Sequence, residues 1–290
     1  MRIGLHGKKF ITESTPYIQE IIDNLEAKGA KIHCSKSFAK ILNDSSVQVT
    51  DLHGFEDQVF QSLDYFFSVG GDGTLLETVT MVGSTGTPIL GINTGRLGFL
   101  ATTAKTDIAS ALDSLFKKEY TYDERILLRL DTDSGLFGKV NFALNEVAFV
   151  KKDTSAMIKI VSTIDDQYLN TYWADGLMIS TPTGSTGYSL SCGGPIVLPH
   201  SQNFLLTPIN PHNLNVTPMV VSDSSVIGIE VDSRGTNFLT SLDSRSETVD
   251  SSVEMTVRKE SFKAKLIKLK GYSFLDTLRN KLNWGFDIRN

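Results

Sequence analysis

Residues 64–75, Asp64-Tyr65-Phe66-Phe67-Ser68-Val69-Gly70-Gly71-Asp72-Gly73-Thr74-Leu75, join an apolar run to a turn that is rich in glycine. The apolar run at 64–69 predicts a buried strand, and 75–82 predicts a helix. Glycines permit a tight turn, and they let backbone N–H groups approach phosphate oxygens closely. The N-terminus of the following helix would add partial positive charge. We therefore predict a phosphate-binding turn made by Gly70, Gly71, Gly73 and Thr74.

Asp72 is the residue of this turn that needs a chemical explanation. No Gly-Lys-Ser/Thr follows at Walker A spacing, and the glycines are too close together for a dinucleotide fingerprint. A carboxylate beside bound phosphates would repel them. Asp72 could instead accept a proton from a substrate hydroxyl or help to hold Mg²⁺. An ordinary Asp-Gly turn between a strand and a helix is the alternative.

The segments around the turn predict a two-part fold. Strand patterns at 2–5, 30–34 and 88–93 alternate with helical patterns at 16–25 and 108–116, which favours a doubly wound parallel sheet. After residue 125 short period-two segments follow one another, including 157–164, 226–231 and 262–269. A helical pattern returns at 274–284.

We therefore expect a Rossmann-like α/β domain and a C-terminal β-sandwich-like domain of antiparallel strands. The first would cover residues 1–121, with the tail 272–290 returning to it. The second would cover residues 122–271. The residue pair Asp165-Asp166 is predicted to form a hairpin tip between two strands of the second domain.

Three further stretches are candidate functional segments. The loop of residues 91–100 (GINTGRLGFL) follows a predicted strand, so it should emerge at the same carboxyl edge of the sheet as Asp72. Residues 175–191 (DGLMISTPTGSTGYSLS) supply many hydroxyls, two flexible glycines and one flat aromatic ring. Asn145-Glu146 interrupts an apolar strand pattern and could bind ribose hydroxyls. Each segment also has a purely structural alternative. The loop at 91–100 could be a structural turn, and residues 175–191 could be an ordinary hydroxyl-rich loop. Asn145-Glu146 could lie on the solvent-exposed face of an edge strand.

Composition argues against several classes of partner. The formal net charge is −5, and the basic residues at 258–270 are interrupted by acidic and apolar ones. Neither nucleic acid nor an anionic membrane surface is therefore an expected partner. Cys34 and Cys192 lack the spacing of a metal site or a disulfide framework, which favours a reducing compartment. With no signal peptide and no apolar stretch of membrane-spanning length, a cytoplasmic location is expected.

Taken together, the glycine turn, the loop at 91–100, Asn145-Glu146 and the block at 175–191 resemble the NAD kinase family. Related glycine turns occur in diacylglycerol kinases, sphingosine kinases and 6-phosphofructokinases. The block D-G-x-x-x-S-T-P-T-G-S-T-x-Y-S-L-S, however, matches the NAD kinase family closely. The resemblance implies phosphoryl transfer from ATP to the 2′-hydroxyl of the adenosine ribose of NAD. It also implies Mg²⁺ or another divalent metal, polyphosphate as donor in some members, and a homodimer or homotetramer.

The resemblance further implies roles for particular residues. Asp72 would be the catalytic base, while the metal ligands stay unknown. The implied NAD-binding residues are Gly73, Phe99, Asn145, Glu146, Asp175, Thr183, Thr186, Gly187, Tyr188 and Ser191. The chain departs from the family pattern at Gly187, where alanine is usual, at Ser244, where glycine is common after Leu-Asp, and at the bulky Trp173.

Two other functions remain open on the sequence. A diacylglycerol-type lipid kinase shares the glycine turn but would need an apolar acyl pocket. A non-catalytic dinucleotide-binding protein would bind NAD without producing NADP.

Overall fold

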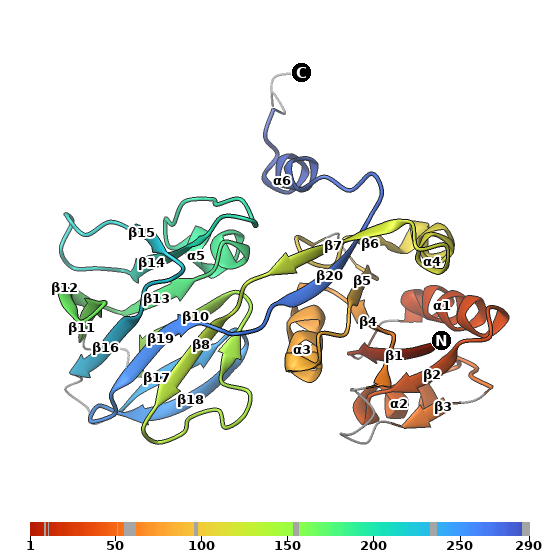
Figure 1. The fold of residues 1–290 in the computed structure, drawn as a ribbon, viewed down its shortest axis with the longest axis horizontal. Helices are drawn as coiled ribbons and strands as arrows, with labels where there is room; N and C mark the ends of the chain where they lie inside the picture. Colours follow the sequence, from red (N-terminus) through yellow and green to blue (C-terminus); the bar gives the residue numbers. More distant parts are fainter. Residues whose placement is uncertain are drawn as a thin grey trace. The chain divides into compact units, whose positions relative to one another are not determined.

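The computed structural model describes residues 1–8, 10, 12–50, 52–54, 62–95, 98–152, 157–232 and 237–285 (Figure 1). The chain forms two compact units, Met1–Asp123 with Lys265–Asn290, and Glu124–Ala264. These divisions fall at 123/124 and 264/265, whereas the sequence analysis places them at 121/122 and 271/272. The larger difference comes from one strand, β20, most of which belongs to the first unit.

The first unit is built on a sheet with strand order β3-β2-β1-β4-β5-β20-β7, in which β6 also pairs with β5. Its strands are β1 Arg2–Gly7, β2 Lys31–Cys34, β3 Leu52–Gly54, β4 Tyr65–Gly70, β5 Ile89–Asn93, β6 Thr103–Ala104, β7 Tyr120–Arg125 and β20 Ala264–Leu269. The pairs from β3 through β5, together with β5–β6 and β5–β20, are parallel. The predicted doubly wound α/β sheet is confirmed.

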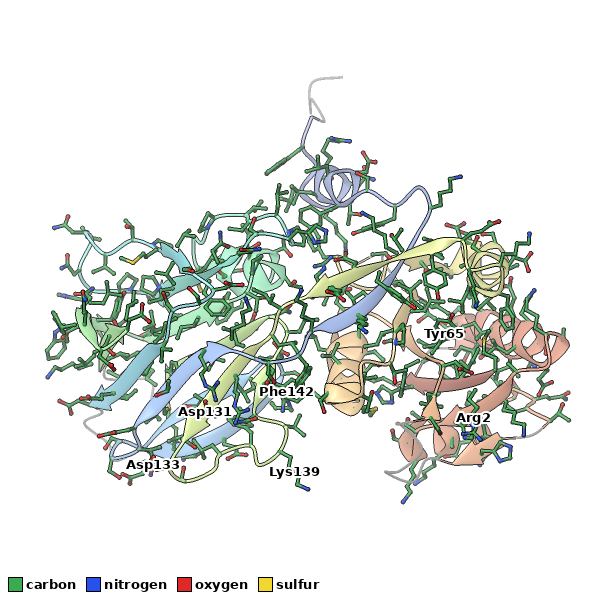
Figure 2. All side chains as sticks on the ribbon, in the orientation of Figure 1. Arg2, Tyr65, Asp131, Asp133, Lys139 and Phe142 are labelled. Carbon is green, nitrogen blue, oxygen red and sulfur yellow. The ribbon has the colours of Figure 1, made fainter. Side chains whose placement is uncertain are left out.

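Helices separate these strands along the chain. They are η1 Thr12–Ser14, α1 Thr15–Ala27, α2 Lys36–Asn43, α3 Asp72–Val82, η3 Gly83–Thr85, η4 Lys105–Asp107, α4 Ile108–Phe116 and α6 Phe274–Leu282. Apolar residues at helical spacing, such as Ile18, Ile22 and Leu25 of α1, are fully buried in the core of this unit. The hydroxyl of Tyr65 on β4 hydrogen-bonds that of Tyr120 on β7 at 2.7 Å (Tyr65 is labelled in Figure 2).

The assignment of residues 262–269 to the β-rich half holds for 262–264 but is wrong for 265–269, which belong to the first unit. Strand β20 pairs in parallel with β5, with Leu266 opposite Ile89. A period-two pattern reports only that one face of a strand is buried, and it fits a strand of either sheet. Only the tertiary pairing decides which sheet receives it.

The second unit contains two six-stranded sheets, ordered β15-β14-β13-β10-β17-β18 and β12-β11-β16-β19-β8-β9. The strands are β8 Leu128–Thr132, β9 Phe142–Ala143, β10 Glu146–Lys151, β11 Ile158–Ile164, β12 Gln167–Ala174, β13 Gly176–Ser180, β14 Asn203–Ile209, β15 Met219–Ser222, β16 Ile227–Asp232, β17 Asn237–Leu242, β18 Arg245–Asp250 and β19 Met255–Lys259. Two short helices, η5 Thr183–Thr186 and α5 Tyr188–Ser191, follow β13.

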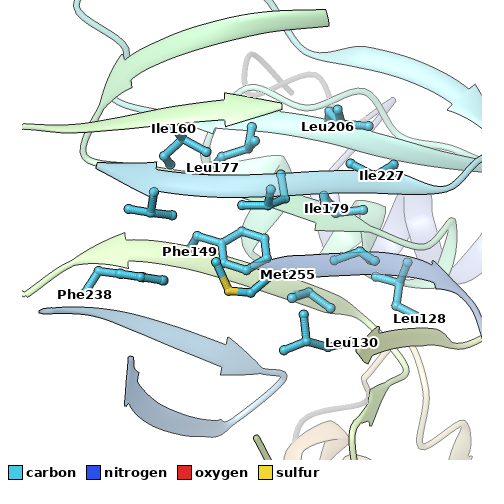
Figure 3. Close-up of a cluster of buried hydrophobic side chains, with 14 of the residues drawn as sticks. Leu128, Leu130, Phe149, Ile160, Leu177, Ile179, Leu206, Ile227, Phe238 and Met255 are labelled. Carbon is cyan, nitrogen blue, oxygen red and sulfur yellow. The ribbon is translucent and has the colours of Figure 1, made fainter. Parts of the chain in front are cut away.

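The pairings within these two sheets are antiparallel, as predicted. Buried side chains from both sheets form one core, to which β8 contributes Leu130, β10 contributes Phe149 and β11 contributes Ile160 (Figure 3). The hairpin tip at Asp165-Asp166 is confirmed, because both residues have the positive φ angles, 50° and 63°, that a tight hairpin turn requires.

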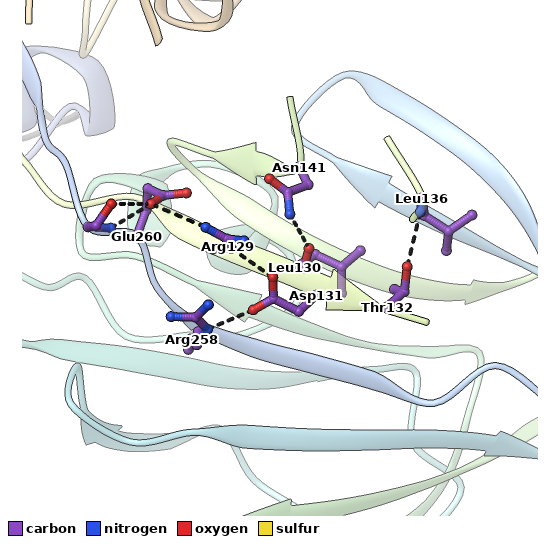
Figure 4. A network of polar contacts seen from close by, with 9 residues as sticks. Arg129, Leu130, Asp131, Thr132, Leu136, Asn141, Arg258 and Glu260 are labelled. Carbon is purple, nitrogen blue, oxygen red and sulfur yellow. Dashed lines mark hydrogen bonds and ion pairs between the residues drawn. The ribbon is translucent and has the colours of Figure 1, made fainter. Parts of the chain in front are cut away.

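Charged side chains on β8 and β19 form a network on one sheet (Figure 4). Arg129 and Arg258 lie opposite each other, and each donates to Asp131, at 2.7 and 2.6 Å. Burial works against ionisation of Asp131, but the two arginine hydrogen bonds lower its pKa. The neighbouring Lys259 pairs with Asp223 at 2.7 Å. The basic residues at 258–259 are therefore paired on a partly exposed strand face.

Within the described ranges, no helix combines the length and the apolar character that crossing a membrane requires.

Candidate active site

The glycine turn joins β4 to α3 directly. Strand β4 ends at Gly70, Gly71 is the N-cap, and α3 begins at Asp72. The helical pattern was predicted over 75–82, whereas the helix begins at Asp72, which therefore lies in its first turn. A Cβ atom at Gly70 would overlap the Thr74 side chain. Glycine is therefore required where the strand turns into the helix.

The Asp72 carboxylate is held by backbone N–H groups of the second glycine-rich loop. Oδ2 accepts a hydrogen bond from Phe99 N at 2.8 Å, and Oδ1 accepts from Leu100 N and Ala101 N at 3.0 Å each. A Cβ atom at Gly98 would overlap all three atoms of the carboxyl group. The absence of a side chain at Gly98 is thus what lets the loop close around Asp72.

A cavity of about 300 Å³ lies beside this turn, at the carboxyl ends of β1, β4 and β5. Its lining includes Lys8, Gly71, Thr74 and Asn93. The chain runs outward from β1 to β2 and β3 and then returns to β4, so the strand order reverses between β1 and β4. Open α/β sheets bind ligands at such a point.

The loop of residues 91–100 emerges at the predicted edge, because Gly70 pairs with Asn93. Within this loop Arg96 and Leu97 lie outside the described residues. The ring of Phe99 lies 6.3 Å from that of Phe274 on α6, a residue of the same unit. Sequence reasoning quoted Gly98 without giving it a role, although a glycine directly before the loop's aromatic residue was the available signal.

In the second unit, Asn145 and Glu146 are positioned by the turn between β17 and β18. The carboxylate of Asp243 accepts hydrogen bonds from the backbone N–H groups of Leu144, Asn145 and Glu146 at 2.9, 2.8 and 3.1 Å. Asp243 has a φ of 53°, a conformation that aspartate tolerates better than most residues. The turn that carries Ser244 in place of the family's glycine therefore holds the Asn-Glu pair.

Arg245 extends this arrangement, and the sequence analysis missed it. Its guanidinium donates to the carbonyl oxygens of Val140 and Phe142, just before the Asn-Glu pair. Phe142 in turn packs edge-on against Phe262, with ring centroids 5.1 Å apart (Phe142 is labelled in Figure 2). The hairpin turn between β17 and β18 thus holds the backbone at several points between residues 140 and 146. Arg245 itself gave no signal, because it reads as an ordinary hairpin residue, although the turn was noted for Ser244.

Glu146 is a carboxyl group of this cluster whose pKa is strongly raised. It begins β10, which lies between β13 and β17, so the alternative of a wet edge strand is wrong. Its Oε2 is buried and has no hydrogen-bond partner among the described residues. Burial, and then the nearby charge of Asp243, raise the pKa of Glu146 to about 8. A buried carboxyl oxygen without a partner is an acceptor held ready for a ligand.

The hydroxyl-rich block packs directly onto Asn145 and Glu146. Thr181 donates its hydroxyl to Leu144 O at 2.6 Å and its N–H to Asn145 O at 2.9 Å. A Cβ atom at Gly184 would overlap the Asn145 backbone, while one at Gly187 would lie 3.4 Å from Glu146 Oε2. The block directly follows strand β12, as expected, and its residues 176–180 form a further strand, the buried β13.

Not every predicted residue joins this cluster. The side chain of Thr183 accepts a hydrogen bond from the buried Arg125 at 3.1 Å, and Thr186 bonds back to Thr183 O at 3.4 Å. Tyr188 is 47% exposed, and Ser191 is exposed too. Burial, followed by smaller effects from Cys192 and Asp175, raises the pKa of Tyr188.

Asp175 lies at the other end of β13. Glu146 is opposite Ser180, whereas Asp175 precedes Gly176, which is opposite Val150. Its carboxylate pairs with Lys151 at 2.6 Å and accepts from Asn210 at 3.2 Å. The hydrogen bond from Lys151 lowers the pKa of Asp175.

Comparison with known proteins identifies the family. Residues 7–120 match the model of the ATP-NAD kinase N-terminal domain, and residues 144–269 match that of the ATP-NAD kinase C-terminal domain. The chain belongs to the NAD kinase family. It is 48% identical to the NAD kinase of Cytophaga hutchinsonii and 40% identical to that of Bacteroides fragilis strain ATCC 25285, in each case over the full length of both chains.

Two solved structures of this family are similar in fold. Yeast NADH kinase, complexed with NADH, superimposes with a TM-score of 0.89 at 22% identity, covering 99% of this chain and 89% of that one. The NAD kinase of Archaeoglobus fulgidus, in complex with ATP, has a TM-score of 0.75 at 25% identity, covering 98% and 99%. The resemblance drawn from the motifs is confirmed, and neither alternative function finds support among these relatives.

Proposed function

We propose that this member of the NAD kinase family transfers the terminal phosphoryl group of ATP to the 2′-hydroxyl of the adenosine ribose of NAD, giving NADP. The observation that carries the proposal is Asp72, a carboxylate fixed by three backbone N–H groups beside a glycine-lined cavity. A fixed carboxylate next to a phosphate-binding turn suits the activation of an alcohol for phosphoryl transfer.

Asp72 acts as the general base through Oδ2. Among the described residues Oδ1 accepts two backbone hydrogen bonds and Oδ2 accepts one, so a lone pair of Oδ2 stays available for the ribose hydroxyl. As the hydroxyl proton moves to Oδ2, the ribose oxygen bonds to the γ-phosphorus. The bond between that phosphorus and the β–γ bridging oxygen breaks, and ADP leaves with the bridging oxygen.

The donor phosphates bind at the glycine turn of Gly70, Gly71, Gly73 and Thr74. The backbone N–H groups of the first turn of α3 and its partial positive charge favour an anion there. The complex of the Archaeoglobus enzyme with ATP supports ATP as the donor.

Mg²⁺, or another divalent cation, is proposed to enter with ATP. Within the described ranges no group of three or more His, Cys, Asp or Glu is placed to hold a metal ion. Such a setting fits Mg²⁺, which is commonly bound by substrate phosphates with only one or two carboxylates. The cation would neutralise charge on the transferred group.

The NAD-binding residues are proposed for each unit separately. Asn145 and Glu146 bind ribose hydroxyls, and the unpartnered Oε2 of Glu146 is the acceptor that supports this role. The remaining NAD contacts are those that the family resemblance implies, namely Gly73, Phe99, Asp175, Thr183, Thr186, Gly187, Tyr188 and Ser191.

Asp72→Asn tests the assignment. Loss of the base is expected to lower kcat about 10²–10⁴-fold with a modest change in KM for NAD. The assay couples NADP formation to a dehydrogenase and is run with ATP, GTP and polyphosphate as donors. Asp64→Asn is the matched control, because its exposed carboxylate also accepts a backbone N–H, from Arg2 at 2.7 Å, but lies away from the turn. Near-normal turnover by Asp72→Asn would exclude Asp72 as the base.

We also propose that the chain forms a homodimer or homotetramer in the cytoplasm. The cytoplasmic location is supported by both cysteines being free, which suits a reducing compartment.

The assembly is supported by the edge strands β12 and β15, which expose Tyr168, Trp173, Met219 and Val220. An uncovered edge of this kind favours pairing with a second copy. Light scattering of the wild type and of Trp173→Glu tests the assembly, and a monomeric wild type would contradict it.

A further inference from the structure

A chain of polar side chains ends at the cavity beside the glycine turn. Ser35, the N-cap of α2, hydrogen-bonds His6 Nδ1 at 2.8 Å, and His6 Nε2 lies 3.2 Å from Glu77 Oε2. The other oxygen of Glu77 pairs with Lys8 Nζ at 2.7 Å. Lys8 lines the cavity together with Gly70 and Gly71. The motif analysis gave none of these four side chains a role.

The protonation of this chain follows from burial and partners. Burial lowers the pKa of His6 against the opposing effect of Glu77, so the ring is neutral. Its Nε2–H then donates to the Glu77 carboxylate, and Nδ1 accepts the hydroxyl proton of Ser35. Partial burial disfavours ionised Glu77, but hydrogen bonds from Lys8 and His6 lower its pKa. Glu77 is therefore a fixed anion that orients Lys8.

We propose that Lys8 binds the phosphate chain of the donor, and that Glu77, held by His6, is the positioning residue that keeps its ammonium group at the cavity. This inference rests on the proposed function and adds a donor-binding residue to it. Lys8 has three N–H donors and, among the described residues, places one of them on Glu77, which leaves two for phosphate oxygens. The side chain of Lys8 is 52% exposed, which leaves the ammonium accessible to a ligand.

The chemistry of the site favours a lysine at this point. The glycine turn offers only neutral N–H groups, and a triphosphate carries several negative charges. A carboxylate that orients a phosphate-binding lysine is also an established solution among phosphotransferases. Lys8 comes from the end of β1 and Glu77 from α3, so the pair joins the two elements that flank the cavity.

Lys8→Met tests the inference. It is expected to raise KM for Mg·ATP on the order of 10- to 100-fold, the effect of losing a charged hydrogen bond, while KM for NAD stays within about twofold. Lys8→Arg should recover part of the loss. Lys36→Met, which removes an exposed lysine at the start of α2, is the matched control and should leave both constants unchanged. The same assays with polyphosphate as donor decide whether Lys8 recognises the phosphate chain itself or only ATP.

The positioning role of Glu77 is tested separately, through KM for Mg·ATP in two variants. Glu77→Ala should raise KM for Mg·ATP with little change in kcat, and Glu77→Gln should restore it, because an amide oxygen still accepts from Lys8. Titration calorimetry with Mg·ATP measures donor binding without turnover. An unchanged Kd in Lys8→Met overturns the inference, as does an equal loss of affinity for NAD. If the wild type makes no NADP, the proposed function is refuted instead. The Kd for Mg·ATP from calorimetry still tests whether Lys8 binds the donor in that case.

Discussion

Gly98→Ala is expected to lower kcat about 100-fold without removing any functional group. The added Cβ would occupy the space of the Asp72 carboxyl group, which accepts three hydrogen bonds from residues 99–101. Either the carboxylate or the loop must shift by on the order of 1 Å to restore contact distance. A displacement of that size costs about 10²-fold in rate when it moves a reacting group.

The same overlap has a separate effect on stability. Overpacking a buried position by one methyl group costs typically about 1–3 kcal/mol of unfolding free energy. Gly228→Ala in β16 is the matched control, because its Cβ would overlap the side chain of Thr163 in the second unit. It should lose some stability, less than Gly98→Ala because the Thr163 hydroxyl can rotate away, and it should keep its kcat. NADP formation under saturating substrates and urea denaturation together separate the two effects.

A double-mutant cycle shows whether Gly98 acts through Asp72. If it does, Gly98→Ala should add little to the loss already caused by Asp72→Asn, because the displaced base is no longer there. The reasoning is refuted if Gly98→Ala loses stability but keeps kcat within about threefold of the wild type. It is also refuted if the two losses of rate multiply in the double variant.

Two further predictions concern the Asn-Glu cluster. The pKa of Glu146 in the folded protein, about 8, lies above the ordinary value of 4.5. Protonation of Glu146 therefore adds to the free energy of unfolding, fully below about pH 4.5, and this contribution is lost as the pH rises to 8. Glu146→Gln should therefore gain stability relative to the wild type between pH 5 and pH 8, measured by thermal melts, and a constant difference would contradict this. Asp243→Asn leaves one acceptor oxygen for three N–H donors, so it should cost about 1–3 kcal/mol in urea titrations and raise KM for NAD. Asp250→Asn, an exposed carboxylate that accepts Ser252 N, should lose much less, and equal losses would refute the special role of Asp243.

The two-part fold could be predicted from the sequence, and candidate residues could be proposed from it, for an identifiable reason. Buried strands, amphipathic helices and glycine turns are local features, and each leaves its own period or residue type in the chain. The junction at Gly70 to Thr74 is such a case, because strand, turn and helix are consecutive. The helix start was misjudged by three residues, since Asp72 and Gly73 read as turn residues until the geometry of the N-terminus is known.

The partners of those residues could not be read in the same way. Asp72 is held by groups 27 to 29 residues away, and Asp243 holds backbone groups 97 to 99 residues away. Backbone N–H groups are present at nearly every position, so a sequence carries no mark of which ones a carboxylate will meet. Lys8 and Glu77 are likewise an ordinary lysine and glutamate until β1 and α3 place them together.

Local sequence thus determined the succession of strands and helices, the glycine turn and the family to which the chain belongs. The tertiary structure alone decided that β20 enters the parallel sheet, that Asp72 is enclosed by the loop after Gly98, and that Asp243 and Arg245 hold the backbone around the Asn-Glu pair. The division has one physical cause. Secondary structure follows from interactions between near neighbours, whereas a site is formed by hydrogen bonds and steric fits between segments that only folding brings together.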